Sequence, residues 1–389
     1  MPASTASPRT ASIVSVPLLG WFAVSFSALL SFYLPLSVVP SDLLARGAGP
    51  VAAGWVMAVL VVHAVAAELV APRIVAHAGP VAVGVAGLAL MALSGVGMAT
   101  LSPVPVVLLF NAVRGFGFGL VVVVVAAQVA GLLPAERRGE GLGWAGVVAG
   151  APAVVGLPLG IWLADQHGPR AAYAAAALAA AVGLAACPWA RHGLRVAPST
   201  DPGRQGDLRV LAATRRAQHR RPATVFMGVV ASAGVLIAFL PGMSLETPRV
   251  VGLALLVHSL CSTSTRLLAG IHGDRHGHRG WLWFGLLGTG AGLVALALRP
   301  SPALLMVAMA LSGAAFGAAQ SASLTLMVAD ARPDDLPALS ALWNASYDLG
   351  LGLGPLVFGM VLVHTSTWTA LMLLLCVLAA CLPSARRCL

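Results

Sequence analysis

The chain has 389 residues, of which 59% are hydrophobic and only 9% are charged, with a formal net charge of +10 at pH 7. Because a soluble domain carries about 25% charged residues, this composition excludes a water-soluble globular protein. Apolar runs of about 20 residues, the length of a membrane-spanning helix, recur from residue 16 to residue 383. The sequence therefore predicts a polytopic membrane protein, whose basic charge reflects membrane topology and not binding to nucleic acid.

Twelve apolar segments are separated by clusters of Pro, Gly and Arg. They are predicted to be helices, because a lipid-exposed backbone must satisfy its own hydrogen bonds and the alternating pattern of a membrane barrel is missing from the sequence. The predicted spans lie near residues 17–39, 51–72, 80–100, 104–133, 141–164, 171–190, 223–242, 248–271, 280–298, 301–329, 336–363 and 366–384. The predicted fold class is all-α and integral to the membrane, and the first apolar run is interpreted as a retained helix rather than a signal peptide.

The two halves of the chain are related by a repeat with an offset of 198 residues. The aligned pairs include Glu68 with Arg266, Leu69 with Leu267, Ala71 with Ala269, Gly79 with Gly277, Gly115 with Gly313, Phe118 with Phe316, Gly119 with Gly317 and Gly156 with Gly354. A repeat of half the chain length indicates two similar units. We expect six helices in residues 1–190, a basic linker at 191–222, and six helices in residues 223–389.

The distribution of arginine predicts the orientation in the membrane. All 23 Lys and Arg residues are Arg, and with both termini in the cytoplasm 17 of them lie on the cytoplasmic side. Four lie outside, at Arg46, Arg170, Arg249 and Arg299. The linker holds eight Arg residues. It either enforces this topology or carries a short basic helix on the anionic inner leaflet.

The segment 270–279, GIHGDRHGHR, falls between the eighth and ninth predicted spans. It resembles the signature loop of the major facilitator superfamily of secondary transporters, with matching positions at Gly270, Asp274, Arg275, Gly277 and Arg279. The six-plus-six helices, the basic central loop and the half-chain repeat are similar to that family as well. The resemblance implies two pseudo-symmetric six-helix bundles that move against each other, with this loop as a gating latch.

The copy of this loop in the first half departs from the family pattern. Ala76 and His77 stand where Asp and Arg are expected, so no charged latch is expected there. Arg266, which lies shortly before the intact loop, is expected to extend toward the membrane surface or to cap the inner end of its helix.

Glycine and proline in the fifth and eleventh spans resemble the antiporter branch of the family. The fifth span holds Gly146, Gly150, Gly156, Pro158 and Gly160, with Leu157 between the usual Gly-Pro pair. The eleventh span holds the better-formed pair Gly354-Pro355. Because Gly and Pro make a helix bendable, the resemblance favours export over uptake.

Two ionisable residues lie deep in their predicted spans. Arg114 is about ten residues, or roughly 15 Å, into the fourth span, and Asp348 is about twelve residues into the eleventh. A charge at this depth costs about 2.5–3.5 kcal/mol. Arg114 therefore either faces a wet cavity or is packed against carbonyl groups. Asp348 either exchanges the coupling proton or is a structural residue hydrogen-bonded to Asn344, one turn earlier.

Glu68, about one turn from the cytoplasmic end of the second span, is the second candidate for proton coupling, with ion pairing at a gate as its alternative. The resemblance implies a central cavity lined by the first, fourth, seventh and tenth helices. The polar residues expected to line the cavity are Ser25, Ser27, Asn111, Arg114, Gln128, Gln320, Ser321 and Ser323, with Asn344 and Tyr347 from the eleventh helix. Such a lining suits a neutral or weakly anionic amphipathic solute.

The sequence thus favours a monomeric, proton-coupled exporter of a small organic molecule in the inner membrane of a bacterium. Its expected partners are the solute, protons and the lipid bilayer, with no cofactor, metal or nucleic acid. Proton-driven uptake, or a sensor that keeps the fold without transport, are the alternatives. A membrane enzyme is not expected, because the sequence shows no nucleophile–base pair and no metal-like spacing among its five cysteines. His272, His276 and His278 lie within the latch loop, so they are interpreted as part of that loop and not as metal ligands.

Overall fold

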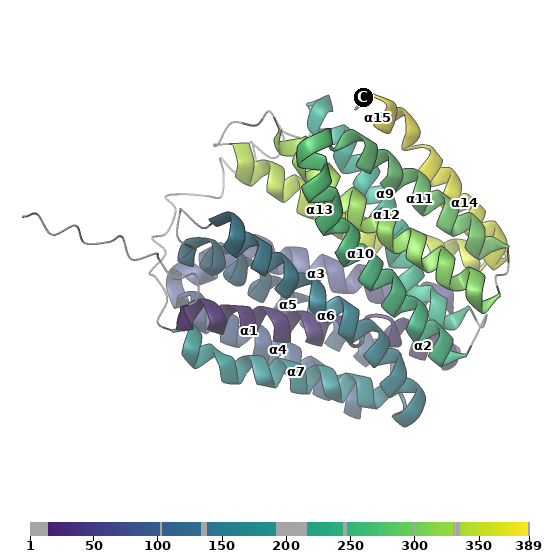
Figure 1. The fold of residues 1–389 in the computed structure, drawn as a ribbon. Helices are drawn as coiled ribbons and strands as arrows, with labels where there is room; N and C mark the ends of the chain where they lie inside the picture. The colour runs from purple at the N-terminus through teal and green to yellow at the C-terminus, as the bar shows by residue number, and fades with distance from the viewer. Residues whose placement is uncertain are drawn as a thin grey trace, which may run out of the picture.

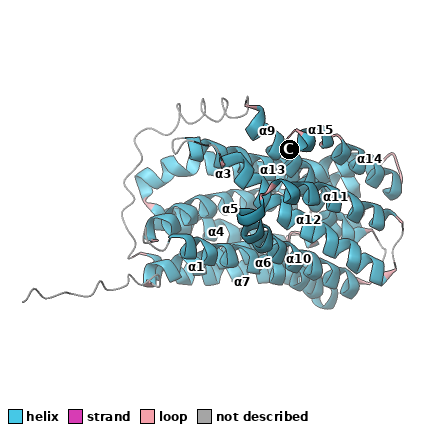
Figure 2. Ribbon diagram, turned by 45° about the horizontal axis from the view of Figure 1, so that its top comes forward, coloured by secondary structure: helices cyan, strands magenta, loops and turns pink. Residues whose placement is uncertain are grey.

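The structure, a computed structural model, describes residues 15–101, 103–133, 138–191, 216–243, 247–298, 301–329, 331 and 335–387. Within these ranges every regular secondary-structure element is a helix (Figure 2). Twelve spans in the described residues are long and apolar enough to cross a membrane. The predicted all-α membrane fold is therefore confirmed.

The helices form two bundles, one from each half of the chain (Figure 1). The first bundle contains α1 (Val16–Tyr33), α2 (Val38–Ala45), α3 (Gly49–Ala78), α4 (Pro80–Thr100), α5 (Val104–Leu132), α6 (Arg138–His167) and α7 (Pro169–Ala190). The second bundle contains α9 (Ala217–Phe239), η2 (Leu240–Gly242), α10 (Pro248–His276), α11 (Arg279–Ala297), α12 (Pro302–Val328), α13 (Leu336–Leu362), α14 (Thr367–Ala379) and α15 (Leu382–Arg386). Most of the predicted linker, residues 192–215, lies outside the described residues.

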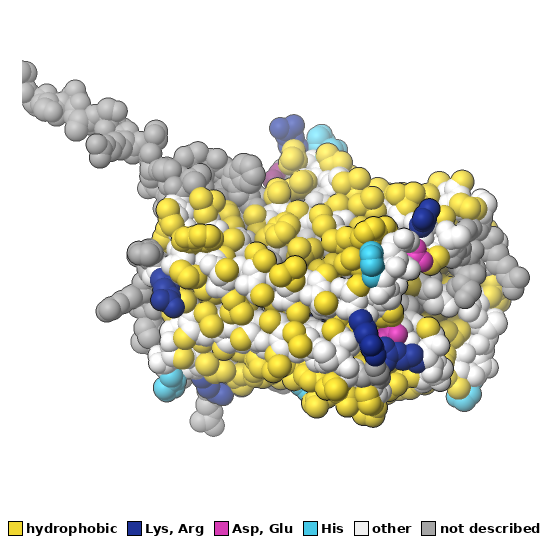
Figure 3. All heavy atoms as spheres, turned by 90° about the horizontal axis from the view of Figure 1, so that it is seen from below, with side chains coloured by type: hydrophobic (Ala, Val, Ile, Leu, Met, Phe, Trp, Pro, Cys, Tyr) yellow, Lys and Arg dark blue, Asp and Glu magenta, His cyan; other side chains and the backbone are white. Residues whose placement is uncertain are grey.

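We name the two ends of the molecule by the chain segments found there. The linker end is where α7 finishes and α9 begins, and the opposite end is where α2 meets α3 and α9 finishes. Large apolar side chains are exposed between the two ends, among them Leu69, Leu109 and Leu178 at 61–69%. Figure 3 shows one such face, which is largely hydrophobic with charged side chains toward its margins. Lipid tails are as apolar as leucine, so this surface suits a bilayer.

The first predicted span, 17–39, lies within one candidate membrane span, Val16–Ala45, but its helix is not continuous. The structure interrupts it with a turn at residues 34–37, between α1 and α2. Pro35 lacks the N–H that would continue the helical ladder, and its ring clashes with the preceding turn. The Leu36 amide instead donates to the Tyr33 carbonyl at 3.2 Å. This break lies beside the boundary between the two bundles.

Beyond the break, α2 is held to α7 by a buried polar cluster at the opposite end. The Arg46 guanidinium pairs with both Asp42 carboxylate oxygens at 2.6 and 2.8 Å. The Tyr173 hydroxyl donates to the same carboxylate at 2.8 Å. This arrangement satisfies the buried charge of Asp42 with two donors, as a charge removed from water requires.

Two helices are longer than predicted at the linker end. The second and eighth spans were predicted to stop near residues 72 and 271, but α3 continues to Ala78 and α10 to His276. Each helix stops at a glycine with positive φ, 82° at Gly79 and 91° at Gly277, which is a conformation that glycine adopts without strain. The latch residues before Gly277 therefore lie in the last two turns of a helix and not in a loop.

Glycines bring α3 into close contact with helices on two sides. On one side, Gly115 of α5 packs against the backbone of Leu60, and Gly119 packs against that of Ala64. An added Cβ at either glycine would clash with a carbonyl oxygen of α3. In the second bundle Gly313 and Gly317 of α12 pack on α10 in the same way. The two halves therefore use equivalent small residues for close helix packing.

On its other side, α3 packs against α13 of the second bundle. Gly54 lies against the Pro355 carbonyl, and Gly352 lies against Val61. The two helices are antiparallel along this contact, because increasing numbers on one meet decreasing numbers on the other. This register places Asp348 of α13 beside the linker-side half of α3.

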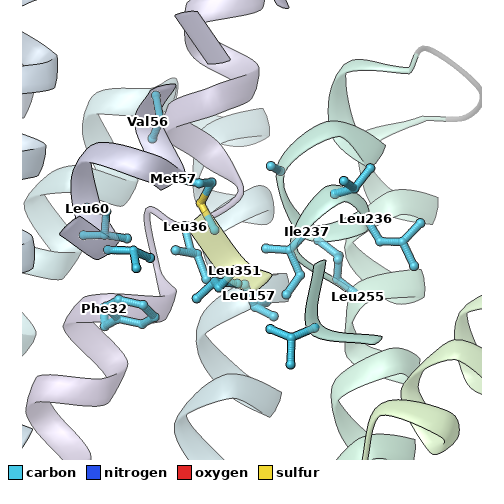
Figure 4. Packing of buried hydrophobic residues seen from close by; sticks show 14 of the residues in the cluster. Phe32, Leu36, Val56, Met57, Leu60, Leu157, Leu236, Ile237, Leu255 and Leu351 are labelled. Atoms are coloured by element: carbon cyan, nitrogen blue, oxygen red, sulfur yellow. The ribbon is translucent and has the colours of Figure 1, made fainter. Parts of the chain in front are cut away.

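Apolar side chains close the boundary between the bundles at the opposite end (Figure 4). Leu36 and Met57 of the first bundle lie near Leu236 and Leu255 of the second, and all four are fully buried. They belong to one hydrophobic cluster that joins both bundles. Solute passage at this end would require these side chains to separate.

Candidate functional site

A cavity of about 100 Å³ lies between the bundles at mid-depth. Six helices line it, namely α1, α6, α9, α10, α12 and α13. Its apolar wall toward the opposite end includes Leu157, Ile237 and Leu351. Its polar lining comes from Tyr33, Ser259, Ser262, Thr263, Arg266, Gln320 and Tyr347. The position between two moving units is where a transported solute is expected to bind.

Arg266 is the cation of this cavity, and the prediction that it extends toward the membrane surface is wrong. Its side chain lines the cavity wall from the middle of α10. Tyr33 and Tyr347, one from each bundle, line the cavity with Arg266, and their hydroxyl groups are close enough to act on its charge. Among the described residues that line this cavity, Arg266 has tyrosine hydroxyls beside it and no Asp or Glu.

A pair of carboxyl groups lies next to this cavity, on the contact between α3 and α13. Glu68 and Asp348 are both half-buried, and the antiparallel register of α3 and α13 places them on the same stretch of that contact. Asp348 follows Tyr347 in α13 and also interacts with its hydroxyl. Asn344, the predicted neighbour of Asp348, is exposed. The structure thus brings together the two predicted proton-coupling residues, one from each bundle.

Arg114 lies outside the cavity and is packed within the first bundle. Its side chain is 1% exposed, and its Nη1 approaches the Phe32 carbonyl at 3.5 Å, at the end of α1. The guanidinium also sits over the Phe32 ring, 5.9 Å from the ring centroid. Its Nε and Nη2 find no hydrogen-bond partner in the described part of the chain. Of the two alternatives for Arg114, the structure favours packing against a carbonyl group at the broken helix.

Most other residues that were predicted to line the cavity face neighbouring helices instead. Asn111 is fully buried and donates to the Val56 carbonyl at 2.6 Å. Ser27 is buried and lies where an added Cβ at Gly183 would meet it. Gln128 is 3% exposed, and Ser25 is half-buried; neither lines this cavity.

In the second bundle, some of the predicted cavity residues line the cavity and others contact neighbouring helices. Gln320 and Tyr347 line the cavity. Ser321 faces α10 near Gly270, and Ser323 accepts a hydrogen bond from the Trp343 indole at 2.9 Å. The predicted lining from the fourth helix is therefore not found at this cavity, where the fifth and eighth helices contribute in addition to the predicted eleventh.

The latch residues sit at the linker end of α10, in contact with the start of α11. Asp274 is 77% exposed and contacts His278 Nε2 at 3.2 Å. Arg275 is exposed. The Trp281 indole donates to the ring of His272 at 3.1 Å. In the residues that the structure describes, no group of three or more His, Cys, Asp or Glu side chains is arranged to hold a metal ion.

Sequence reasoning missed Tyr33 and Arg266 as cavity residues. Arg266 lies ten residues before the last residue of α10, about 15 Å along the helix axis. The predicted end at residue 271 placed Arg266 one turn from the surface. The continued helical pattern up to Gly277, a typical C-terminal glycine, was the signal for its true depth.

Comparison with known proteins agrees with this architecture. The Major Facilitator Superfamily model matches residues 21–246 and 223–384. No curated protein sequence matches the chain. Among solved structures, a mutant of the nucleoside transporter NupG has a TM-score of 0.75 at 14% identity, covering 96% of this chain and 99% of that one. A D-xylose-proton symporter has a TM-score of 0.70 at 16% identity, covering 95% of each chain.

A bacterial homologue of the human lysosomal transporter Spinster, in an inward-facing and unoccupied conformation, has a TM-score of 0.75 at 14% identity. That likeness covers 88% of this chain and 81% of the other. Identities this low show the shared fold, and the family match extends over nearly the whole sequence. With twelve spans in two bundles around a central cavity, this chain belongs to the Major Facilitator Superfamily and is a transporter rather than an enzyme.

Proposed function

We propose that this transporter exports a small amphipathic organic molecule in exchange for protons, by alternating access of the central cavity. The observation that carries the proposal is that Glu68 and Asp348, two half-buried carboxyl groups from different bundles, lie on the same stretch of the contact between α3 and α13. Two ionised carboxylates at one site repel each other, whereas one bound proton permits a hydrogen bond between them. Proton binding therefore favours contact between α3 and α13, and proton release favours their separation.

The packing around this pair supports a rocking movement. Toward the opposite end, the contact between α3 and α13 continues through Gly54 and Gly352. Apolar side chains seal the same end (Figure 4). If arginine sets the linker end in the cytoplasm, the cavity is closed to the outside.

The direction of transport is proposed from α6 and α13. Pro158 lies inside α6 and Pro355 inside α13, and both helices face the boundary between the bundles. Gly354 of α13 packs against the backbone of Ala231 in α9, so α13 packs closely on its own bundle as well as on α3 of the first bundle. Uptake is the second candidate, since one structural relative is described as a D-xylose-proton symporter.

The proposal is tested by measuring solute movement in membrane vesicles of known orientation. Everted vesicles that contain the protein are energised so that their interior becomes acidic, and a panel of radiolabelled organic acids, amines and neutral amphiphiles is added. An exporter accumulates its solute inside these vesicles and dissipates the acid gradient at the same time. Accumulation only in right-side-out vesicles would support uptake.

Asp348→Asn provides the matched variant, because Asn has nearly the same volume and carries no titratable proton. It should abolish accumulation against a gradient while counterflow of labelled against unlabelled solute survives in part, since counterflow needs no net proton movement. Asp165→Asn, an exposed acid at the opposite end, should leave both activities intact. If no solute moves in vesicles of either orientation, the non-transporting sensor becomes the better explanation.

A further inference from the structure

We propose that the cavity binds an organic monocarboxylate, held by the Arg266 guanidinium between Tyr33 and Tyr347. This inference rests on the proposed function in taking the cavity as the solute site, and it names the class of solute. It concerns binding alone and does not depend on the direction of transport or on proton coupling.

The first support is an uncompensated cation in the cavity wall. Arg266 is half-buried in the wall of the cavity, and the described residues that line the cavity with it include Tyr33 and Tyr347 but no Asp or Glu. A cation taken out of water is costly unless an anion or several acceptors compensate it. The side chain lines open space, so the missing anion can come from a solute.

The second support is the comparison of the two halves. The offset of 198 that aligns Glu68 with Arg266 also aligns Asp348 with Gly150. Glu68 of α3 and Asp348 of α13 lie on the same stretch of the contact between these helices. The equivalent contact in the other half is that of α10 with α6. There the residue that matches Asp348 is Gly150, so α6 places no carboxylate opposite Arg266.

Of the two α6 glycines that line the cavity, Gly146 leaves open space beside it and Gly150 packs closely on α10. An added Cβ at Gly146 would meet no atom within 4 Å. At Gly150 an added Cβ would lie 2.9 Å from the Thr263 methyl group, so even alanine would crowd α10 there. The first bundle thus places no carboxylate beside Arg266. The carboxylate of a bound solute would compensate the charge of Arg266.

The geometry favours a carboxylate over other anions. A guanidinium binds a carboxylate through two parallel hydrogen bonds, and the hydroxyls of Tyr33 and Tyr347 are further donors at the same place. A doubly charged phosphate ester would call for more than one cation, and Arg266 is the only Arg or Lys among the residues that line this cavity.

The remainder of the solute should be compact and apolar. Phe316 and the two tyrosines offer aromatic surface, while Leu157, Ile237 and Leu351 offer aliphatic surface. The cavity volume of about 100 Å³ is below the roughly 300–1,000 Å³ of sites for drug-sized ligands. A single aromatic ring with a carboxylate matches this lining.

The experiment uses the purified full-length protein in detergent, with benzoate and its neutral amide, benzamide, as probes. Thermal unfolding is followed as each probe is titrated at constant ionic strength, with sodium phosphate as a control anion. A ligand that binds the folded state raises the Tm in a concentration-dependent way. Benzoate should raise the Tm of the wild type, and benzamide and phosphate should not.

Two variants assign the effect to the cavity. Arg266→Gln should weaken benzoate binding by about tenfold or more, the loss expected for a charge-assisted hydrogen bond. Arg249→Gln, which removes an exposed Arg from the other end of the same helix, should bind benzoate as the wild type does. If Arg266→Gln does not fold, Tyr347→Phe serves as the second variant, and it should weaken benzoate binding while benzamide still leaves the Tm unchanged.

Equal stabilisation of the wild type by benzoate and benzamide, or by benzoate and phosphate, would overturn the proposal. So would a benzoate effect that survives in Arg266→Gln, or no benzoate effect at all. These outcomes leave the vesicle experiments on proton coupling untouched, because they report equilibrium binding. A loss of coupling in Asp348→Asn would likewise leave the benzoate result unaffected.

Discussion

Glu68 of α3 and Asp348 of α13 lie on the same stretch of the boundary between the two bundles, although they come from opposite halves of the chain. This stretch lies on the linker side of a glycine-lined packing surface. Tyr347, the residue before Asp348, reaches the cavity and the Arg266 guanidinium. Asp348, whose charge changes on proton binding, is thus adjacent in sequence to a residue of the proposed solute site. This arrangement allows proton binding and solute binding to influence each other.

Membrane topology is the first testable consequence. A reporter fused after Arg46, in the turn between α2 and α3, should behave as external. A reporter fused after Arg204, which lies outside the described residues, should behave as cytoplasmic. Alkaline phosphatase and green fluorescent protein fusions make complementary readouts, because each is active on one side only. Identical behaviour of the two fusion sites would refute the predicted orientation.

Arg114 should matter for stability through its volume and not through its charge. Its guanidinium is buried and only partly hydrogen-bonded in the described structure. Replacement of a buried ion by an apolar residue of similar size is often neutral or stabilising by about 1–4 kcal/mol. Arg114→Met should therefore keep or raise the Tm, whereas Arg114→Ala leaves a cavity that costs about 2–5 kcal/mol.

Thermal unfolding in detergent checks this prediction, with expression and monodispersity as controls. If Arg114→Met loses as much stability as Arg114→Ala, the guanidinium makes polar interactions that the bundle needs. The approach of Nη1 to the Phe32 carbonyl would then be essential to the broken first helix.

The glycine contact between α5 and α3 gives a third prediction. An alanine at Gly115 would press against the Leu60 carbonyl, and overpacking of this kind costs about 1–3 kcal/mol. Gly115→Ala should lower the Tm. Gly280→Ala, at a helical position where an added Cβ meets nothing within 4 Å, should be neutral or slightly stabilising. Equal effects of both substitutions would show that α3 and α5 do not pack this closely.

The latch at the linker end of α10 gives a fourth prediction. Asp274→Asn removes the charge that contacts His278, and it should slow transport by shifting the balance between the two conformations. Ala76→Asp, which restores the family's acid in the first-half copy, should have little effect. Transport rates in vesicles would decide the matter, and equal defects at both positions would mean that the two loops act alike.

The sequence allowed much of the fold to be predicted, because bilayer thickness and the backbone's need for hydrogen bonds restrict each span to an apolar helix. The repeat offset also identified Gly115 and Gly313 as equivalent positions, and both pack on equivalent helices. The break at residues 34–37 was missed, although Pro35 stands there, because hydropathy alone continues through it.

The candidate site was harder to predict, because depth along a helix does not say which way a residue faces. Arg114 and Asp348 lie at similar predicted depths, yet the structure packs Arg114 inside the first bundle and places Asp348 at the boundary. No residue near Arg266 in the sequence indicates that its side chain lines a cavity. Its role follows from tertiary contacts with Tyr33 and Tyr347, which only the docking of the two bundles creates.

The most direct test of the account is whether the charge on the Glu68–Asp348 pair controls the separation of the bundles at the linker end. Spin labels at Ala76 and His276, both exposed there, would be introduced after the five cysteines are replaced by serine, and their distance measured by pulsed electron resonance across pH. The labels in the otherwise unchanged protein should move apart as the pH rises, since two ionised carboxylates repel. With Asp348→Asn they should stay at the short distance at every pH, whereas Asp165→Asn should respond as the parent does. The same pH response with and without Asp348 would contradict the account.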